Sequence, residues 1–312
     1  MSRVVCLGEA VVDFVSEQPV EQLTDARSFA PSFGGSQANV AVGAARIGAR
    51  ATLAGCAGTD DWGTWLRARL ADEGVDVSLY ALREEVQTTI AFVALAPDAE
   101  PTFTIYGGSR DGMLASCGDR VLALVAEGPP GVLAFGSDTL IARGDRDTVG
   151  ALVGECDLRG WRVLYDPNLR ERRWADHELM RAVAREAVRE TTVVKANRFE
   201  AALLTGAAEP AAAASALVAH GARQALVTLG AEGALLADAD GIVRFEAERV
   251  ELVDATGAGD AVAAVAAAAL ARRPLLTPAD VGVAMRVAGA VVAARGALTG
   301  FPAPSEARAL LR

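Results

Sequence analysis

The segment best suited to chemistry is a run of small residues that leads directly into an alanine-rich stretch. It reads Asp254-Ala255-Thr256-Gly257-Ala258-Gly259-Asp260. Small side chains let backbone N–H groups approach an anion closely, and a helix start adds the positive end of its dipole. Asp260 would lie in the first helical turn, where it could take a proton from an attacking hydroxyl. Phosphoryl transfer needs little more than such a base and an anion site, although a loop with Asp260 as a helix cap would have the same sequence.

Polar and glycine residues near the N-terminus are candidates to bind a small polyol. Asp13 follows a predicted first strand, and a carboxylate accepts two sugar hydroxyls well; the alternative is a solvated aspartate at a strand end. Gly34 and Gly35 permit positive φ and close backbone approach, or simply form a turn. Asn39 falls in the first turns of a predicted helix, where a cap or a surface position is the alternative.

A second set of candidates follows predicted strands in the C-terminal half. Asn197 and Glu200 are one turn apart at a predicted helix start, so they can face one ligand or cap the helix together. Gly230 and Gly233 would shape a turn, with or without a ligand. Lys195 is the only lysine among 30 basic residues, which we interpret first as a bias toward arginine, although its strand-end position also suits a phosphate.

These residues need a framework of alternating strands and helices. Apolar, β-branched runs predict strands at 3–8, 10–15, 51–57, 132–135, 162–165, 192–195, 225–228 and 234–237. Periodic segments predict helices at 38–47, 60–74, 144–159, 176–190, 198–205 and 211–220. Such alternation is typical of an α/β fold with a doubly wound, mostly parallel sheet flanked by helices, whose ligands lie at the carboxyl ends of the strands.

Two β-rich runs, 88–95 and 102–106, depart from this alternation and predict a hairpin. We expect a single domain over residues 1–312. Within it, discontinuous segments at about 10–33 and 86–108 would form a small β-sheet lid.

The composition excludes several classes of function. The net charge is −10, whereas nucleic-acid binders usually carry a basic face. The four cysteines are widely spaced and there are only two histidines, which argues against a zinc site, a disulfide framework and a histidine-based triad. The apolar N-terminus is short and contains acidic residues, so it predicts a buried strand rather than a signal peptide, and no membrane span is predicted. We expect a cytoplasmic protein.

Motifs in a fixed order resemble those of the ribokinase-like (PfkB-type) carbohydrate kinases. Residues 254–261 look like that family's C-terminal signature, and the segment from Phe33 to Gly48 looks like its N-terminal signature. Further matches are Gly8-Glu9 with Asp13, Gly63 to Asp76, Asp166 to Arg170, Lys195 to Glu200 and Thr228 to Gly233. The resemblance covers nearly the whole chain and implies an ATP-dependent sugar kinase.

The resemblance also implies a role for each matching residue. Asp260 would be the catalytic base, with an anion hole formed by Gly257, Ala258 and Gly259. The sugar would be held by Asp13, Gly34, Gly35 and Asn39. Tyr106, the aromatic residue that closes the lid hairpin, would be a further contact.

The nucleotide and ion sites are implied in the same way. Asn197 and Glu200 would orient the ATP phosphates and, through water, Mg²⁺. The nucleotide-binding turn would contain Thr228, Gly230 and Gly233. Asp254 and Thr256 match positions that contribute to a K⁺ site in some members.

The identity of the sugar rests on fewer residues. Ribokinases usually carry lysine where this chain has Ser36-Gln37, so ribose is disfavoured. The segment from Asp166 to Arg170 resembles fructokinases and 2-keto-3-deoxygluconate kinases; in the latter Arg170 could pair with the substrate carboxylate, a surface ion pair being the alternative. Both groups often have an arginine directly after the hairpin aromatic, whereas here two glycines follow Tyr106 and Arg110 comes later.

We therefore predict a fructokinase-like enzyme, with a 2-keto-3-deoxygluconate kinase as the alternative. A non-catalytic sugar or nucleotide sensor on the same fold is the alternative of another class. A dinucleotide-dependent oxidoreductase is disfavoured because residues 257–262 lack the third glycine of its fingerprint. The expected partners are a sugar and ATP, and an exposed edge of the lid sheet favours a homodimer.

Overall fold

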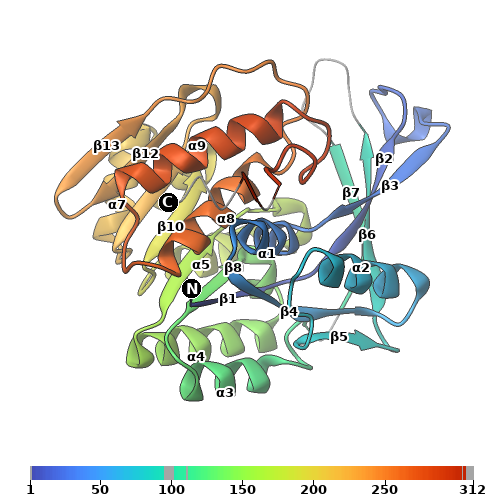
Figure 1. Ribbon diagram of the computed structural model, residues 1–312, viewed down its shortest axis with the longest axis horizontal. Helices are drawn as coiled ribbons and strands as arrows, with labels where there is room; N and C mark the ends of the chain where they lie inside the picture. The colour runs from blue at the N-terminus through green and yellow to red at the C-terminus, as the bar shows by residue number, and fades with distance from the viewer. Residues whose placement is uncertain (1, 95–101, 110–111, 304, 307–312) are drawn as a thin grey trace.

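The computed structural model describes residues 2–94, 102–109, 112–303 and 305–306. The strands of its larger sheet are β1 Arg3–Leu7, β4 Arg50–Gly58, β5 Tyr80–Arg83, β8 Val132–Gly136, β9 Arg162–Asp166, β10 Val193–Asn197, β11 Gln224–Thr228, β12 Ala234–Asp238 and β13 Gly241–Phe245. They lie in the order β13-β12-β11-β10-β9-β8-β1-β4-β5 (Figure 1), and we call them the main sheet. Neighbouring strands from β11 to β5 are parallel, whereas the β11–β12 and β12–β13 pairs are antiparallel.

Helices cover both faces of the main sheet. One face carries α1 Ser36–Ile47, α2 Asp61–Asp72, α8 Ala258–Leu270 and α9 Pro278–Val292. The other carries α3 Gly118–Glu127, α4 Arg143–Arg159, α5 His177–Glu186, α6 Arg198–Thr205 and α7 Pro210–Ala219. Successive strand residues point to opposite faces, so Val4 of β1 packs in the first layer and Val5 in the second. Burial on both faces is why these strands are apolar without alternation.

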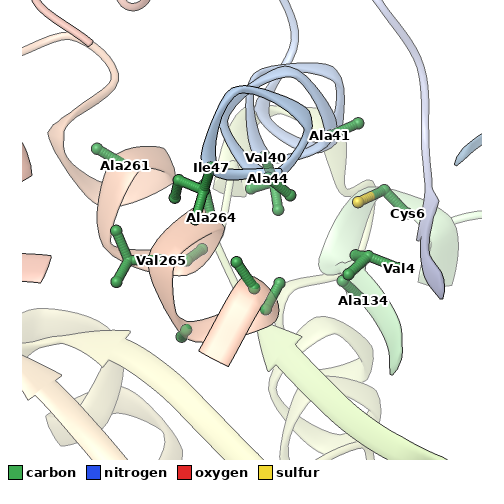
Figure 2. Close-up of a cluster of buried hydrophobic side chains, with 14 of the residues drawn as sticks. Val4, Cys6, Val40, Ala41, Ala44, Ile47, Ala134, Ala261, Ala264 and Val265 are labelled. Atoms are coloured by element: carbon green, nitrogen blue, oxygen red, sulfur yellow. The ribbon is translucent and has the colours of Figure 1, made fainter. Parts of the chain in front are cut away.

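The two helices that carry the predicted signatures, α1 and α8, pack directly on each other (Figure 2). Every residue of Ala261–Leu270 is buried, and Ile47 of α1 lies in the same cluster as Val265. Alanine and glycine let the backbones approach closely: a Cβ added at Gly43 would lie 2.6 Å from the Cβ of Ala264. The small residues of both helices therefore fix the distance between the two signatures.

A second, smaller sheet contains β3 Phe29–Gly34, β2 Val11–Ser16, β6 Gln87–Ala94 and β7 Thr102–Gly108, in that order (Figure 1). We call it the small sheet. Its β2–β3 and β6–β7 pairs are antiparallel, whereas β2 and β6 are parallel. Phe14, Phe92 and Tyr106 lie on one face, where Phe14 also meets Trp62 of α2. The other face faces a cavity, described below.

The predicted fold class is confirmed. The predicted strands and helices coincide with observed elements to within a few residues, and the four strands of the small sheet fall in the two predicted segments. The helix predicted for 176–190 ends earlier, at Glu186. The prediction missed β3, β5, β13, α3 and α9. The residues between the hairpin strands, 95–101, and Arg110 lie outside the described residues.

Within the described residues, no single helix is both long and apolar enough to span a membrane. Among the helices that the structure describes, α6 and α7 have the required length and composition only when taken together, and they are bent by 53°.

Candidate active site

A cavity of about 760 Å³ lies where the carboxyl ends of the main-sheet strands meet the small sheet. The chain continues from β1 to β4 on one side and returns to β8 on the other, so the strand order reverses between β1 and β8. Residues after both strands, Gly8-Glu9 and Ser137–Thr139, line the cavity. A cleft at such a reversal is the usual ligand site of open α/β sheets.

The structure brings most of the predicted site residues together. The cavity is lined by Asp13, Gly35, Asn39, Arg170, Asn197, Glu200, Thr228, Gly230, Thr256, Gly257, Gly259 and Asp260. The predicted residues that do not line it are Gly34, Tyr106, Gly233, Asp254 and Ala258.

Asp260 is held from α1. Its Oδ1 accepts a hydrogen bond from Ser36 Oγ at 2.7 Å, and its Oδ2 accepts one from Asn39 Nδ2 at 2.8 Å. Both donors come from the first turn of α1 and lie three residues apart, so they share one face of the helix. Ser36 was not among the predicted site residues, although its spacing from Asn39 is a signal that identifies it.

The turn before α8 requires glycine. Gly257 is the N-cap of α8 with φ of 82°, and a Cβ there would lie 2.5 Å from the Cα of Ala297. This conformation places Gly259 and Asp260 in the first turn, beside the cavity. The backbone N–H of Ala258 already donates to Ala255 O at 3.3 Å. Contrary to expectation, Ala258 therefore serves the turn rather than the cavity wall.

Asp13 projects from β2 into the cavity, and its pKa is raised to about 7. Burial is the main cause, the negative charge of Asp260 adds to it, and Arg170 opposes both. Gly34 does not line the cavity, but a Cβ there would lie 2.0 Å from Asp13 Oδ2. Gly34 is thus needed to leave room for the Asp13 carboxylate. Gly35, with φ of 99°, is the N-cap of α1.

Asn197 and Glu200 form the capping box of α6 that was the alternative interpretation. Asn197 Oδ1 accepts from the backbone N–H groups of Phe199 and Glu200, and Glu200 Oε2 accepts from Asn197 N, each at 2.9 Å. Glu200 Oε1 accepts from Leu169 N at 2.9 Å. Both side chains still line the cavity, so capping fixes them there.

The donor set fits magnesium. Mg²⁺ in phosphoryl-transfer sites is usually held by one or two carboxylates, phosphate oxygens and water, rather than by a cage of protein ligands. Glu200 lines the cavity, and since both of its carboxylate oxygens accept backbone hydrogen bonds, it would reach the ion through water. The described residues contain no group of three or more His, Cys, Asp or Glu that could hold a metal. A magnesium ion shared with nucleotide phosphates suits this arrangement.

Lys195 is buried directly beneath the glycine turn. Its Nζ lies 2.9 Å from Asp166 Oδ2 and 2.9 Å from the position of a Cβ added at Gly259. Burial alone disfavours the ammonium, but the carboxylates of Asp166 and Glu200 outweigh it, and the pKa of Lys195 is raised. A positive charge therefore lies beside the predicted anion hole.

Of the residues predicted to bind nucleotide or K⁺, some line the cavity and others hold the backbone around it. Thr228 and Gly230 line the cavity, whereas a Cβ at Gly233 would lie 1.8 Å from Phe245 O, so Gly233 is needed for backbone packing. Asp254 accepts from the backbone N–H groups of Thr256 and Gly296, both at 2.9 Å. It supports the loop, while Thr256 lines the cavity.

Tyr106 was predicted to contact the sugar, but its side chain does not line the cavity. Its side chain is on the face of the small sheet opposite the cavity, 56% exposed, with its ring 6.1 Å from that of Phe92. Residues of a strand alternate between faces, so its neighbour Ile105 and Phe103 line the cavity instead. Their apolar side chains were not identified from the sequence.

A charged cluster at the same cavity was also missed. Arg173 Nη1 donates to Glu9 Oε1 at 2.7 Å and lies 3.3 Å from Asp138 Oδ1. Thr89 of β6 donates to Glu9 Oε2, which links the small sheet to the cluster. We call these four residues the Arg173 clamp; all of them line the cavity. They follow β1, β8 and β9 or lie in β6, so nothing in their local sequence connects them.

Comparison with known proteins identifies the family. Residues 1–304 match the model of the pfkB family of carbohydrate kinases. The chain is 33% identical to the aminoimidazole riboside kinase of Salmonella typhimurium, over 100% of this chain and 95% of that protein. It is also 33% identical to the fructokinase of Salmonella typhimurium, over 96% of each.

Solved structures are similar over the whole chain. The fructokinase of Vibrio cholerae O395, in a form with fructose, ADP and calcium, has a TM-score of 0.85 at 27% identity, covering 100% of this chain and 99% of that one. The aminoimidazole riboside kinase of Salmonella enterica, in complex with its riboside and an ATP analogue, has a TM-score of 0.80 at 28% identity, covering 99% and 100%. The chain belongs to the pfkB family of carbohydrate kinases and is an ATP-dependent sugar kinase, a phosphotransferase that acts on a hydroxyl group.

Proposed function

We propose that the protein transfers the γ-phosphate of ATP to a hydroxyl of fructose, with Asp260 as the catalytic base. The observation that carries the proposal is the placement of Asp260, in the first turn of α8 behind a glycine turn, in one cavity with Asp13. A base and an anion site thus face a carboxylate suited to sugar hydroxyls.

The residues divide the work as follows. Asp13 accepts hydrogen bonds from sugar hydroxyls and orients the ring, while Ser36 and Asn39 hold Asp260 toward the reacting hydroxyl. Asp260 takes the proton of that hydroxyl as it attacks the γ-phosphorus.

Three features would stabilise negative charge on the transferring phosphoryl group. They are the glycine turn at Gly257 and Gly259, the dipole of α8 and the Lys195 ammonium. Glu200 and Asn197 would orient Mg²⁺ through water, and the ion when bound neutralises phosphate charge.

Fructose is favoured by the curated fructokinases of similar length and by the segment from Asp166 to Arg170. Aminoimidazole riboside is the second candidate, because the kinase for it matches the chain over its full length. The carboxylates that surround the cavity give no support to a sugar acid, and the sensor and oxidoreductase alternatives are not needed.

The test is an ADP-release assay with Mg-ATP and K⁺ across fructose, aminoimidazole riboside, ribose and 2-keto-3-deoxygluconate. We expect fructose to give the highest kcat/KM. Preference for the riboside would replace fructose by the second candidate. Absence of turnover with every acceptor would contradict the proposal.

The role of Asp260 is tested separately. Asp260→Asn keeps the size of the side chain but removes its basicity, so kcat should fall by at least about 10²-fold while ATP binding by calorimetry changes little. Near-normal turnover would remove Asp260 from its role.

K⁺ dependence and dimerisation belong to the same proposal. The loop of Asp254 and Thr256 supports K⁺ activation, and one fructokinase neighbour is described in a form with bound potassium. Replacing KCl by NaCl at equal ionic strength should lower turnover.

The β3 and β7 edges of the small sheet would pair between subunits, and sedimentation velocity that finds only monomer would reject this. Cytoplasmic location stays a prediction.

A further inference from the structure

We propose that the Arg173 clamp determines acceptor specificity: Glu9 and Asp138 neutralise Arg173, so the cavity takes an uncharged, hydroxyl-rich sugar and rejects a sugar acid. The inference rests on the proposed function, because it concerns the acceptor of that reaction. Arg173 is then a specificity-determining residue, and the two carboxylates keep it from a substrate anion.

The clamp lies within reach of a sugar bound at Asp13. Asp13 pairs with Ala91 in the register of β2 and β6, and Thr89 is two residues earlier on β6. Residues two apart point to the same face, about 7 Å apart along the strand. Since Thr89 donates to Glu9, the clamp begins about one sugar length from the Asp13 carboxylate.

Arg173 is paired with two carboxylates through a single nitrogen, Nη1, so they balance its positive charge. Glu9 is 7% exposed, and its ion pair with Arg173 is short at 2.7 Å. Burial alone would lower the pKa of Arg173, but the carboxylates of Glu9 and Asp138 outweigh it and raise that pKa. A sugar carboxylate would meet a guanidinium whose charge is already balanced by two carboxylates that the fold itself supplies.

The acceptor region carries no net positive charge that would attract an anion. It contains the carboxyl groups of Glu9, Asp13, Asp138 and Asp260 against the guanidinium groups of Arg170 and Arg173. Burial raises the pKa of Asp13 to about 7 and also raises that of Asp138, so the negative charge on these two is partial near neutral pH. Arg170 is exposed, so solvent weakens its attraction for an anion. Hydroxyl donors, by contrast, find buried oxygen atoms that have no hydrogen-bond partner among the described residues: Gln37 Oε1, Asn39 Oδ1 and Ser137 Oγ.

Neutralising either carboxylate should release Arg173. Glu9→Gln and Asp138→Asn each remove one negative charge while keeping the side chain's size. The readout is the ratio of kcat/KM for 2-keto-3-deoxygluconate to that for fructose, in which a general loss of activity cancels. We expect each variant to raise this ratio at least about tenfold, the effect of one unit charge at this range in a partly shielded site.

Two further variants control for charge and for the arginine itself. Glu171→Gln makes the same change in the 3-10 turn Glu171–Arg173, on an exposed residue that does not line the cavity, and should leave the ratio unchanged. Arg173→Gln in the Glu9→Gln background should abolish the gain, because the released cation is then missing.

An unchanged ratio in both Glu9→Gln and Asp138→Asn, with fructose turnover retained, would overturn the inference. If either variant does not fold, as judged by circular dichroism, the other decides. Failure of the proposed function has a different signature, since wild type would then phosphorylate none of the neutral sugars. In that case calorimetric affinities for fructose and 2-keto-3-deoxygluconate supply the ratio, and an unchanged affinity ratio counts equally against the clamp.

Discussion

Ser36 and Asn39, both in the first turn of α1, donate to the two oxygens of Asp260. The two hydrogen bonds limit the rotamers of the carboxylate. The base is therefore oriented by the fold, and a sugar hydroxyl need only approach a carboxylate already in place. Ser36 touches Asp260 rather than the reacting atoms of a substrate, so it is a positioning residue.

Removing the Ser36 hydroxyl should weaken catalysis more than substrate binding. Ser36→Ala should lower kcat by about tenfold, the worth of one hydrogen bond to a charged group, while the KM for the sugar changes little. Ser36→Thr keeps a hydroxyl and should restore most of kcat. A kcat of Ser36→Ala equal to that of wild type would show that the contact has no role in the reaction.

The raised pKa of Asp13 predicts pH-dependent sugar binding. Free protein holds a proton on Asp13 below about pH 7, whereas sugar hydroxyls bind best to the ionised form. Fructose affinity, measured by calorimetry without nucleotide, should fall about tenfold from pH 8 to pH 6. Equal affinity at both values would contradict this assignment.

The same shift affects stability with a defined sign. The pKa of folded Asp13 lies above its ordinary value of 3.8, so the folded state binds the extra proton between about 3.8 and 7. The contribution of Asp13 to stability is therefore greatest at low pH and falls as the pH rises through this window. Burial of Asp13 therefore lowers the free energy of unfolding at neutral pH, while it supplies a carboxylate that can bind the sugar.

At the scale of elements, the contact of α1 with α8 determines the site geometry. Gly43→Ala adds a methyl group 2.6 Å from the Cβ of Ala264 and should destabilise the fold by about 1–3 kcal/mol in urea unfolding. Gly150→Ala, in α4, meets no atom within 4 Å and should instead stabilise by about 0.5–1 kcal/mol. Equal effects of the two substitutions would show that the α1–α8 distance is not tightly fixed.

The sequence predicted those strands and helices that have a clear local pattern of apolar residues. The apolar strands and the helices with caps were found because burial on both faces and helical periodicity leave direct signals, whereas β3 contains Pro31 and β13 is almost wholly exposed. For the site, glycine turns and acidic residues in motifs were identifiable. Arg173 and Glu9 were not assigned, because their 2.7 Å contact joins segments 164 residues apart and only the fold brings them together. Tyr106 was misplaced because facing depends on register, which one aromatic residue cannot determine.

At the scale of the whole molecule, the small sheet forms one wall of the cavity and should move onto bound sugar. Peptides from β6 and β7 should exchange amide hydrogens more slowly with saturating fructose than without, because sugar would link Asp13 and the main sheet. ATP alone should protect these peptides less. Unchanged exchange of both strands with sugar would argue against closure.

The single lysine gives the protein an unusual chemical surface. Lys195 is 5% exposed and paired with Asp166, so a reagent that acylates amines meets no accessible lysine side chain on the folded chain. Acylation of Lys195 requires an opening that uncovers the floor of the cavity. The rate at which this one lysine is labelled, read from the peptide that contains it, would therefore record how often the catalytic centre opens, and bound nucleotide should slow it.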